Sequence, residues 1–408
     1  MSSLNPVKTE NLYQNYSRSA LDLTPNMAML PVSPLVNWGI HSEIISKIHG
    51  RSVAYDPLSP ILQLDEYGHP LGSLDWKGAR LDNIFLTEDK YSRGGVRLNG
   101  LLVIDQYPRI VNNSEIARRI GIPTERILSV EKILELPLDG RMVDVDTWKT
   151  ITRQRLVKRV EEDNNFLSHL PAKNIAEKIS SIYEFFATDF IIIQRENPVN
   201  QRYEDLCLFT DKEELTEKLS PTFRWLNLVK RYKPDSIIVK HLPFEPLRVS
   251  DNSHIYKYLT RYLPETMGRI LGLQHMHDIR VNFASSKNFT SVGTPLDVDS
   301  WTSPIFGDDP NSEHDLQEDL QLIRMHVRDV TGEFIRNGYF NNIENHEQRA
   351  IVEATQALFF GYLTGRLRNK PNNHSGYDVI IGLLKESEEQ SLLKKVIYSE
   401  SDHYFDNQ

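Results

Sequence analysis

The segment that most constrains this chain covers residues 285–299, with the sequence SSKNFTSVGTPLDVD. Gly293 and Pro295 are typical turn residues, so the pattern predicts a short strand, a tight turn and a second strand. Asn288 would stand on one strand and Asp297 on the next. An amide oxygen and a carboxylate are ligands that Mg²⁺ takes beside nucleotide phosphates. A surface hairpin with ordinary polar residues has the same pattern, so the choice depends on the rest of the chain.

The composition is that of an ordinary globular protein. The chain has 408 residues, of which 39% are hydrophobic and 25% charged, and this is enough for a large core or two lobes. The net charge of -9 argues against non-specific binding to nucleic acids or anionic membranes. A local basic cleft for phosphates remains compatible with this charge.

Cysteine usage and hydrophobic runs bear on location. Cys207 is the one cysteine in the sequence, so no disulfide framework and no cysteine-based zinc site can form within one chain. Residues 1–26 are polar and lack the apolar core of a signal peptide. Residues 185–193 are the longest apolar candidate, and Asp189 interrupts them, so no membrane-spanning segment is expected. We therefore expect a cytoplasmic protein without membrane or nucleic-acid partners.

The first part of the chain has the pattern of β structure. Residues 1–30 are expected to form a loose arm, and residues 42–48 place isoleucines at helical spacing. Residues 51–82 combine alternating segments with turn residues, including a predicted strand that ends at Lys77. A lysine in this position binds phosphate in kinases. A solvated lysine on an edge strand is the alternative interpretation.

A small loop at residues 91–97 combines two glycines with two arginines. Glycine lets backbone N–H groups approach an anion, and arginine binds phosphate through two parallel hydrogen bonds. The pattern therefore predicts nucleotide contacts from Arg93, Gly94, Gly95 and Arg97.

Most of the remaining chain has helical periodicity. Helices are expected over residues 113–119, 146–162, 172–190, 215–232, 264–277 and much of 316–395. Short strands are expected over residues 126–130 and 236–239. Strands followed by helices indicate an α+β fold. The expected organisation is an N-terminal arm (1–30), a β-rich nucleotide-binding lobe (31–145) and a mainly helical lobe (146–408) that carries the hairpin.

Four pieces of the chain, in the same order, resemble the selenoprotein O (YdiU) family of kinase-fold protein adenylyltransferases. They are SPLVN (residues 33–37), LDWKGA (74–79) with YSRGG (91–95), SEIA (114–117) with GIPTERILS (121–129), and the segment 285–299. The third piece is the most specific match. In the fourth, the family spaces an Asn, a Gly and an Asp much as Asn288, Gly293 and Asp297 are spaced.

The resemblance implies a divergent member with a two-lobed, protein-kinase-like fold that binds ATP and Mg²⁺, with Mn²⁺ as a possible substitute. It implies that Lys77 binds the phosphates and that Asn288 and Asp297 bind the metal. Lys77 and Asp297 are then the expected catalytic residues. Arg93 lies in the nucleotide-loop motif, and Arg51 stands where the family has a glycine-rich turn.

One departure from the family changes the expected chemistry. The family has an aspartate directly before the metal-binding asparagine, where it acts as general base, and this chain has Lys287. A protonated lysine cannot accept a proton unless its pKa is lowered. Nearby residues that could replace the base are His275, His277, Asp278 and Asp299. The histidines have an alternative role as structural residues at a helix end, and Asp299 has alternatives as a metal ligand or a turn cap.

Three classes of function remain open. The expected one is an ATP- and Mg²⁺-dependent nucleotidyltransferase that moves AMP to a protein or peptide acceptor. The enzymatic alternatives are a phosphotransferase and a ligase that activates a carboxylate as an acyl-adenylate. A ligase needs no base, and Lys287 could then neutralise developing charge. The non-enzymatic alternative is a nucleotide-binding pseudokinase scaffold, which the joint retention of Lys77, Asn288 and Asp297 disfavours.

Overall fold

The computed structural model describes a large part of the chain and shows a mixed α+β fold. The described residues are 4–6, 8–15, 34–36, 47–49, 52–55, 62–78, 86–89, 95–98, 101–139, 141–163, 166, 174–206, 212–282, 288–308, 316–336 and 346–366. They combine an antiparallel sheet with helices, and this confirms the predicted α+β class.

The contacts within the chain define two compact units. Unit 1 takes Met1–Ser59, Gly72–Asn112 and Arg126–Asn200, and unit 2 takes Pro60–Leu71, Asn113–Glu125 and Gln201–Gln408. The sequence pattern predicted a mainly helical lobe that begins at residue 146. This residue lies inside unit 1, within the stretch Arg126–Asn200. Each unit thus draws on three separate stretches of the chain.

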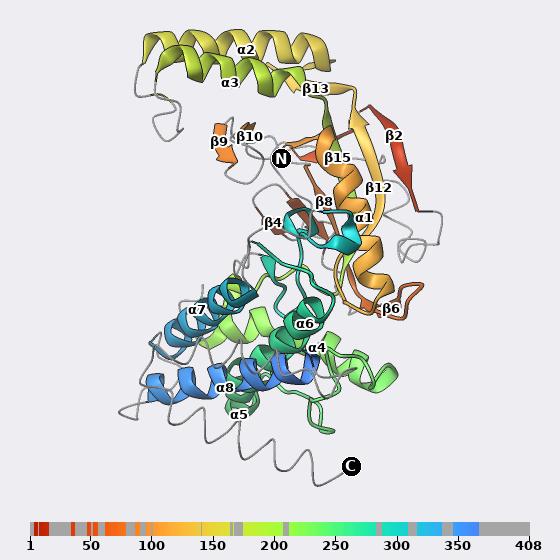
Figure 1. Ribbon diagram of the computed structural model, residues 1–408, viewed down its shortest axis with the longest axis vertical. Coiled ribbons are helices and arrows are strands. Elements are labelled where there is room, and N and C mark those ends of the chain that lie inside the picture. The colour runs from red at the N-terminus through yellow and green to blue at the C-terminus, as the bar shows by residue number, and fades with distance from the viewer. Residues whose placement is uncertain are drawn as a thin grey trace. The chain divides into compact units, whose positions relative to one another are not determined.

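Unit 1 is built on a seven-stranded antiparallel sheet among the described residues (Figure 1). The strand order is β2 (Thr9–Gln14), β12 (Arg126–Ile133), β15 (Phe190–Asn197), β8 (Ser73–Lys77), β5 (Ser52–Tyr55) and β4 (Lys47–His49), with β11 (Leu102–Val103) also paired to β15. Residues 190–193 of β15 are all apolar and at most 1% exposed. A continuous apolar run of this kind is typical of a strand that is covered on both faces.

Shorter antiparallel pairs accompany the sheet. In unit 1 they are β1 (Leu4–Pro6) with β3 (Pro34–Val36), β9 (Leu86–Asp89) with β10 (Gly95–Leu98), and β13 (Glu135–Leu138) with β14 (Arg141–Asp144). In unit 2, β6 (Gln63–Leu64) pairs with β7 (Pro70–Leu71).

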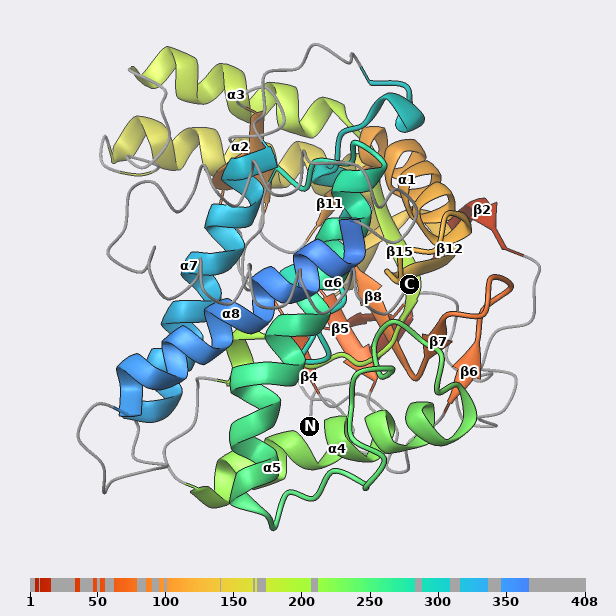
Figure 2. The same cartoon turned by 60° about the horizontal axis from the view of Figure 1, so that its bottom comes forward.

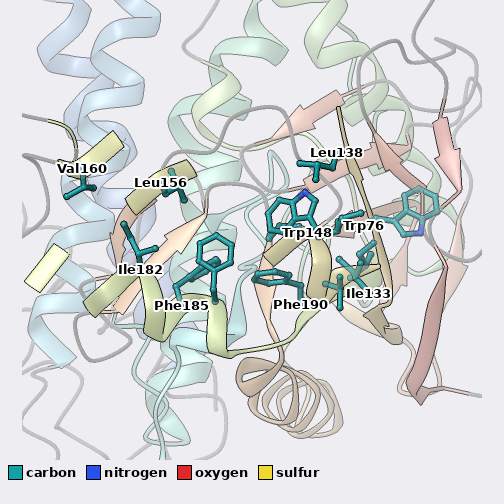
Figure 3. Close-up of a cluster of buried hydrophobic side chains, with 14 of the residues drawn as sticks. Trp76, Ile133, Leu138, Trp148, Leu156, Val160, Ile182, Phe185 and Phe190 are labelled. Atoms are coloured by element: carbon teal, nitrogen blue, oxygen red, sulfur yellow. The ribbon is translucent and has the colours of Figure 1, made fainter. Parts of the chain in front are cut away.

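Two antiparallel helices, α2 (Val145–Glu162) and α3 (Ile175–Ala187), lie side by side in unit 1 (Figure 1). Each begins with a side-chain cap, because Asp144 accepts a hydrogen bond from Thr147 N at 2.8 Å and Asn174 caps α3 in the same way. Their apolar faces form an aromatic core with the sheet (Figure 3). The rings of Trp148 and Phe190 meet edge to face there, with centroids 5.9 Å apart.

Helix α1 (Tyr107–Arg119) begins six residues before the predicted helix and ends as predicted, before Gly121 with its φ of 96°. Its last part belongs to unit 2, where the buried Arg118 Nε donates to Asp65 Oδ2 at 3.0 Å. His69 Nε2 lies 2.8 Å from the Arg118 carbonyl. These contacts attach the β6–β7 hairpin to the helix.

The described part of unit 2 contains the helices α4 (Lys212–Tyr232), α5 (Asn252–Lys257), a π-helical turn (Tyr258–Tyr262), α6 (Leu263–Met276), α7 (Leu316–Phe334) and α8 (His346–Arg366). α6 is buried from Leu263 to His275, and α8 crosses it (Figure 2). The crossing is close because both helices offer glycines. A Cβ on Gly268 of α6 would lie 2.0 Å from the Leu358 carbonyl oxygen of α8. Within the described ranges, no helix is both long and apolar enough to cross a membrane.

Three predictions of local structure are wrong. Lys47 and Ile48 belong to β4 and not to a helix over residues 42–48. The helix predicted over residues 172–190 ends at Ala187, because Phe190 begins the strand that pairs with β12 and β8. Residues 236–239 form turns and not a strand, since Val239 N donates to the Ser236 carbonyl at 3.0 Å. In addition, residues 9–14 of the expected N-terminal arm form the paired strand β2.

Candidate functional site

The predicted turn lies in unit 2, but isolated bridges take the place of the two predicted strands, and residues 285–287 lie outside the described residues. We call residues 288–297 the hairpin. Phe289 and Pro295 pair as an isolated antiparallel bridge, and the Leu296 amide donates to the Asn288 carbonyl at 2.8 Å. Asn288 therefore lies opposite the residue that precedes Asp297. The amide and the carboxylate that were expected to bind a metal come from the same end of one hairpin.

The tip of the hairpin is closed by its own residues and packs on α6. Thr290 Oγ1 and Thr294 Oγ1 lie 2.6 Å apart, and Gly293 N donates to the Thr290 carbonyl at 2.9 Å. Gly293 has a φ of 80°, and a Cβ there would come within 3.1 Å of Met267 Cγ. Glycine suits this position for its backbone conformation and for its lack of a side chain.

The two predicted metal ligands differ in exposure and in backbone conformation. Asn288 is 8% exposed, and Asp297 is half-buried. Asp297 adopts the left-handed conformation, with φ 58° and ψ 53°. This conformation is uncommon outside glycine, and strained residues of this kind cluster at functional sites. Ser300 Oγ donates to the Asp297 carbonyl at 3.2 Å, which helps to hold the backbone in this conformation.

The end of α1 and the turn after it hold the second side of the hairpin. Thr124 Oγ1 donates to the Pro295 carbonyl at 2.8 Å, and Val298 N donates to Glu125 Oε1 at 3.2 Å. Asn113 Nδ2 donates to the Val298 carbonyl at 2.9 Å. Thr124 and Glu125 belong to the most specific piece of the family resemblance. The third and fourth pieces of that resemblance are therefore in direct contact.

Residues that the sequence did not single out hold the first side of the hairpin. Tyr203 N donates to the Phe289 carbonyl at 2.9 Å, and Ser291 N donates to the Gln201 carbonyl at 2.7 Å. Thr222 Oγ1 of α4 lies 2.9 Å from Ser291 Oγ. These partners are far from the hairpin in sequence and belong to no motif, so no local pattern could have revealed them.

Asp319 of α7 holds the chain just before the hairpin. Its buried carboxylate accepts hydrogen bonds from Val281 N at 2.7 Å and from Asn282 N at 3.0 Å. Asn282 Nδ2 in turn donates to the Ser300 carbonyl at 2.8 Å. No sequence motif pointed to Asp319. The available signal was an acidic residue beside Leu320, on the apolar face of a predicted helix.

The histidines considered as bases occupy the end of α6. His275 is completely buried, with Nδ1 2.9 Å from the Tyr362 hydroxyl and Nε2 3.5 Å from Asp319 Oδ2. Burial lowers the pKa of His275, and Asp319 opposes this effect. Burial also lowers the pKa of His277. The complete burial of His275 fits the structural role at a helix end and not proton transfer with a substrate.

The two aspartates considered as bases flank the hairpin segments. Asp278 is exposed in the turn after α6, with a φ of 53°. Asp299 is half-buried in the short 3-10 helix after Asp297. The backbones of Arg280 and Thr302 pair as an antiparallel bridge, which joins the segments that carry the two aspartates.

Lys77 belongs to unit 1 and ends strand β8, as predicted. Its backbone pairs with Ser52 of β5 on one side and with Ile193 of β15 on the other. Lys77 is 2% exposed, so it is not the solvated edge-strand lysine of the alternative interpretation. Burying an ammonium group in a sheet is costly unless it has charged or polar partners.

The other predicted nucleotide-binding residues are described in part or not at all. The backbones of Gly95 and Arg97 lie in β10, which pairs with β9. Arg51, Arg93, Gly94 and Lys287 lie outside the described residues. Their roles stay predictions.

The donors of the hairpin fit a hard cation that also binds phosphate. Over the described part of the chain, no group of three or more His, Cys, Asp or Glu residues could hold a metal ion. Asn288 and Asp297 offer oxygen ligands, and Mg²⁺ is commonly held by one or two carboxylates together with phosphate and water. Asn288 and Asp297 thus offer the kind of donor atoms that a hard divalent cation takes.

A scan against protein-family models found no match, and a search of curated proteins found none either. Function is therefore inferred from the residues and their geometry.

Proposed function

We propose that the protein is an ATP- and Mg²⁺-dependent transferase that moves AMP to a protein or peptide acceptor, with a two-lobed, kinase-like fold of the selenoprotein O kind. The observation that carries this proposal is the hairpin, which brings Asn288 and Asp297 to one end of one element. Support also comes from Thr124 and Glu125, which bind the hairpin and belong to the most specific piece of the resemblance.

The proposed roles follow from the chemistry of each side chain. Asn288 and Asp297 would hold Mg²⁺, which when bound neutralises phosphate charge. Lys77 would contact the phosphates, as the corresponding strand lysine does in kinases. The nucleotide contacts proposed from the sequence are Arg51, Arg93, Gly94, Gly95 and Arg97.

An aspartate near the hairpin would replace the family's general base. Asp278 and Asp299 can both accept a proton, and neither is fully buried. His275 is a poor candidate because it is enclosed between Tyr362 and Asp319. A carboxylate acceptor would need no base and would give an acyl-adenylate.

The proposal is tested by incubating the protein with Mg²⁺, a set of protein acceptors and either α-³²P-ATP or γ-³²P-ATP. We expect covalent label from α-³²P-ATP and none from γ-³²P-ATP. Asp297→Asn should reduce labelling at least about 100-fold, because it removes a charge that stabilises the transferring group. Asn also tolerates the left-handed backbone at this position, so the fold should persist.

The matched control is Asp329→Asn, which changes an exposed aspartate of α7 and should leave labelling unchanged. Label from γ-³²P-ATP alone would make the protein a phosphotransferase. Carboxylate-dependent exchange of pyrophosphate into ATP, without protein labelling, would favour the ligase. Nucleotide binding without any of these reactions would leave the scaffold and contradict the proposal.

A further inference from the structure

A cavity of about 640 Å³ lies in unit 2 between the end of α4 and the loop that follows it. It shares no lining residue with the hairpin site. Arg224, Lys230 and Arg231 of α4 line it on one side, and Phe244 and Glu245 of the loop line it on the other. Its volume lies within the range of sites that bind small molecules or peptide side chains.

Hydrogen bonds between α4 and the loop preform the cavity. Asn227 Nδ2 donates to the Leu247 carbonyl at 2.9 Å, and Leu247 N donates back to Asn227 Oδ1 at 2.8 Å. Lys230 Nζ donates to the carbonyls of Val239 and Lys240, at 3.1 and 3.3 Å. The helix thus holds the loop at two points, so a ligand would not have to order it.

The wall of the cavity carries an unusual aromatic residue. Phe244 is 99% exposed, more than any other large hydrophobic residue that the structure describes. Its ring centroid lies 5.5 Å from Lys230 Nζ, within the range of a cation–π contact. Exposed aromatic residues beside a pocket are typical anchors of protein–protein contacts.

The charge around the cavity is opposite to that of the chain. Three cationic side chains and one carboxylate line it, whereas the whole chain has a net charge of -9. Arg224 is exposed, and among the described residues no carboxylate pairs with it. Guanidinium groups in this situation bind carboxylates through paired hydrogen bonds. The complementary ligand is therefore acidic.

We propose that this cavity is a docking site for an acidic peptide segment of a protein partner. An aromatic or other apolar side chain of the peptide packs against Phe244, and neighbouring carboxylates bind Arg224 and Arg231. A peptide can form ion pairs with the cationic side chains and also pack an apolar side chain against Phe244. A small carboxylic acid can form only the ion pairs. This site is independent of the proposed transferase activity.

The test is fluorescence anisotropy with the full-length protein and three short labelled peptides. One alternates Glu and Phe, the second replaces Phe by Ala, and the third replaces Glu by Lys. We expect saturable binding of the first peptide alone, weakened by added salt because the contacts are partly exposed ion pairs. Arg224→Glu and Phe244→Ala should each weaken binding by about tenfold or more, as expected for anchor residues of an interface.

Two matched variants control for unspecific effects. Arg328→Glu reverses the charge of an exposed arginine on α7, and Met325→Ala truncates an exposed apolar side chain on the same helix. Both should bind the Glu–Phe peptide as the unchanged protein does, and thermal unfolding should confirm that all four variants fold. The proposal is overturned if the Glu–Phe peptide shows no saturable binding, or if it binds Arg224→Glu and Phe244→Ala with unchanged affinity. Equal binding of the Glu–Ala peptide would refute the role of Phe244.

Discussion

The buried carboxylate of Asp319 holds the chain just before the hairpin in place. It accepts hydrogen bonds from two backbone N–H groups, those of Val281 and Asn282, and it lies beside His275. Glu125 has a similar role on the other side of the hairpin, where it accepts a hydrogen bond from Val298 N. Asn288 and Asp297 could be singled out from the sequence because an amide and a carboxylate are typical ligands of Mg²⁺. Supporting groups such as Asp319 are defined only by their partners in the folded chain.

Replacing Asp319 should destabilise the protein more than replacing an exposed aspartate of the same helix. Asp319→Ala leaves the buried N–H of Val281 and the half-buried N–H of Asn282 without an acceptor, and we expect the free energy of unfolding to fall by about 3 kcal/mol. Asp319→Asn keeps one acceptor oxygen and should cost less. Urea denaturation measures both effects. Asp329→Ala is the control, and equal losses for Asp319→Ala and Asp329→Ala would show that the carboxylate has no such role.

His241 should make stability depend on pH in the acidic range. Burial lowers the pKa of His241 to about 3 from an ordinary value of 6.5, and Arg269 adds to the effect. Between these values the unfolded state binds a proton that the folded state does not. Stability is therefore complete above pH 6.5 and falls as the pH falls from about 6.5 to about 3.

This dependence can be isolated with His241→Gln. The substitution removes the titrating group, so the free energy of unfolding should lose about 1.4 kcal/mol less per pH unit in the variant than in the unchanged protein. Denaturant unfolding at several pH values below 6.5 gives both curves. Parallel curves would mean that His241 also accepts its proton in the folded state.

Among the helices and strands, the sequence pattern predicted those whose conformation depends on interactions between residues close in sequence. The helices after residues 145 and 212 and the strand that begins at Arg126 follow their hydrophobic periodicity. Strand β15 was missed because its apolar start continues the pattern of α3, and only pairing with β12 and β8 makes it a strand. Strand β2 was missed for the same reason, since its polar sequence acquires its conformation by pairing with β12.

The close approach of α6 and α8 at their crossing depends on glycines in both helices. Gly268→Ala should lower the free energy of unfolding by about 3 kcal/mol or more, because its Cβ would lie 2.0 Å from a carbonyl oxygen of α8 and the helices would have to separate. Thermal and urea unfolding measure the loss. Gly332→Ala on α7 is the control, since its Cβ would first meet the flexible Glu347 side chain at 3.1 Å. Similar effects of the two substitutions would contradict the close packing.

At the scale of the whole molecule, the chain order predicted the α+β class but not the composition of the units. Each unit combines three stretches that are separated in sequence. The hydrogen bond between Thr124 and the Pro295 carbonyl joins two segments that are far apart in the sequence. Hydrophobic periodicity could not predict this contact, because it relates only residues that are close in sequence. The order of the motifs placed both segments in one family resemblance. The hydrogen bonds that join the two segments became visible only in the folded chain.

We propose that the hairpin binds ATP through Mg²⁺ held by Asn288 and Asp297. Isothermal titration calorimetry of ATP into the protein, with Mg²⁺ and then with excess EDTA, tests this binding. We predict binding that requires Mg²⁺, that weakens about tenfold or more in Asp297→Asn through loss of a charged ligand, and that is unchanged in Asp329→Asn. Binding of equal strength with EDTA or in Asp297→Asn, or no binding of ATP at all, would contradict the claim.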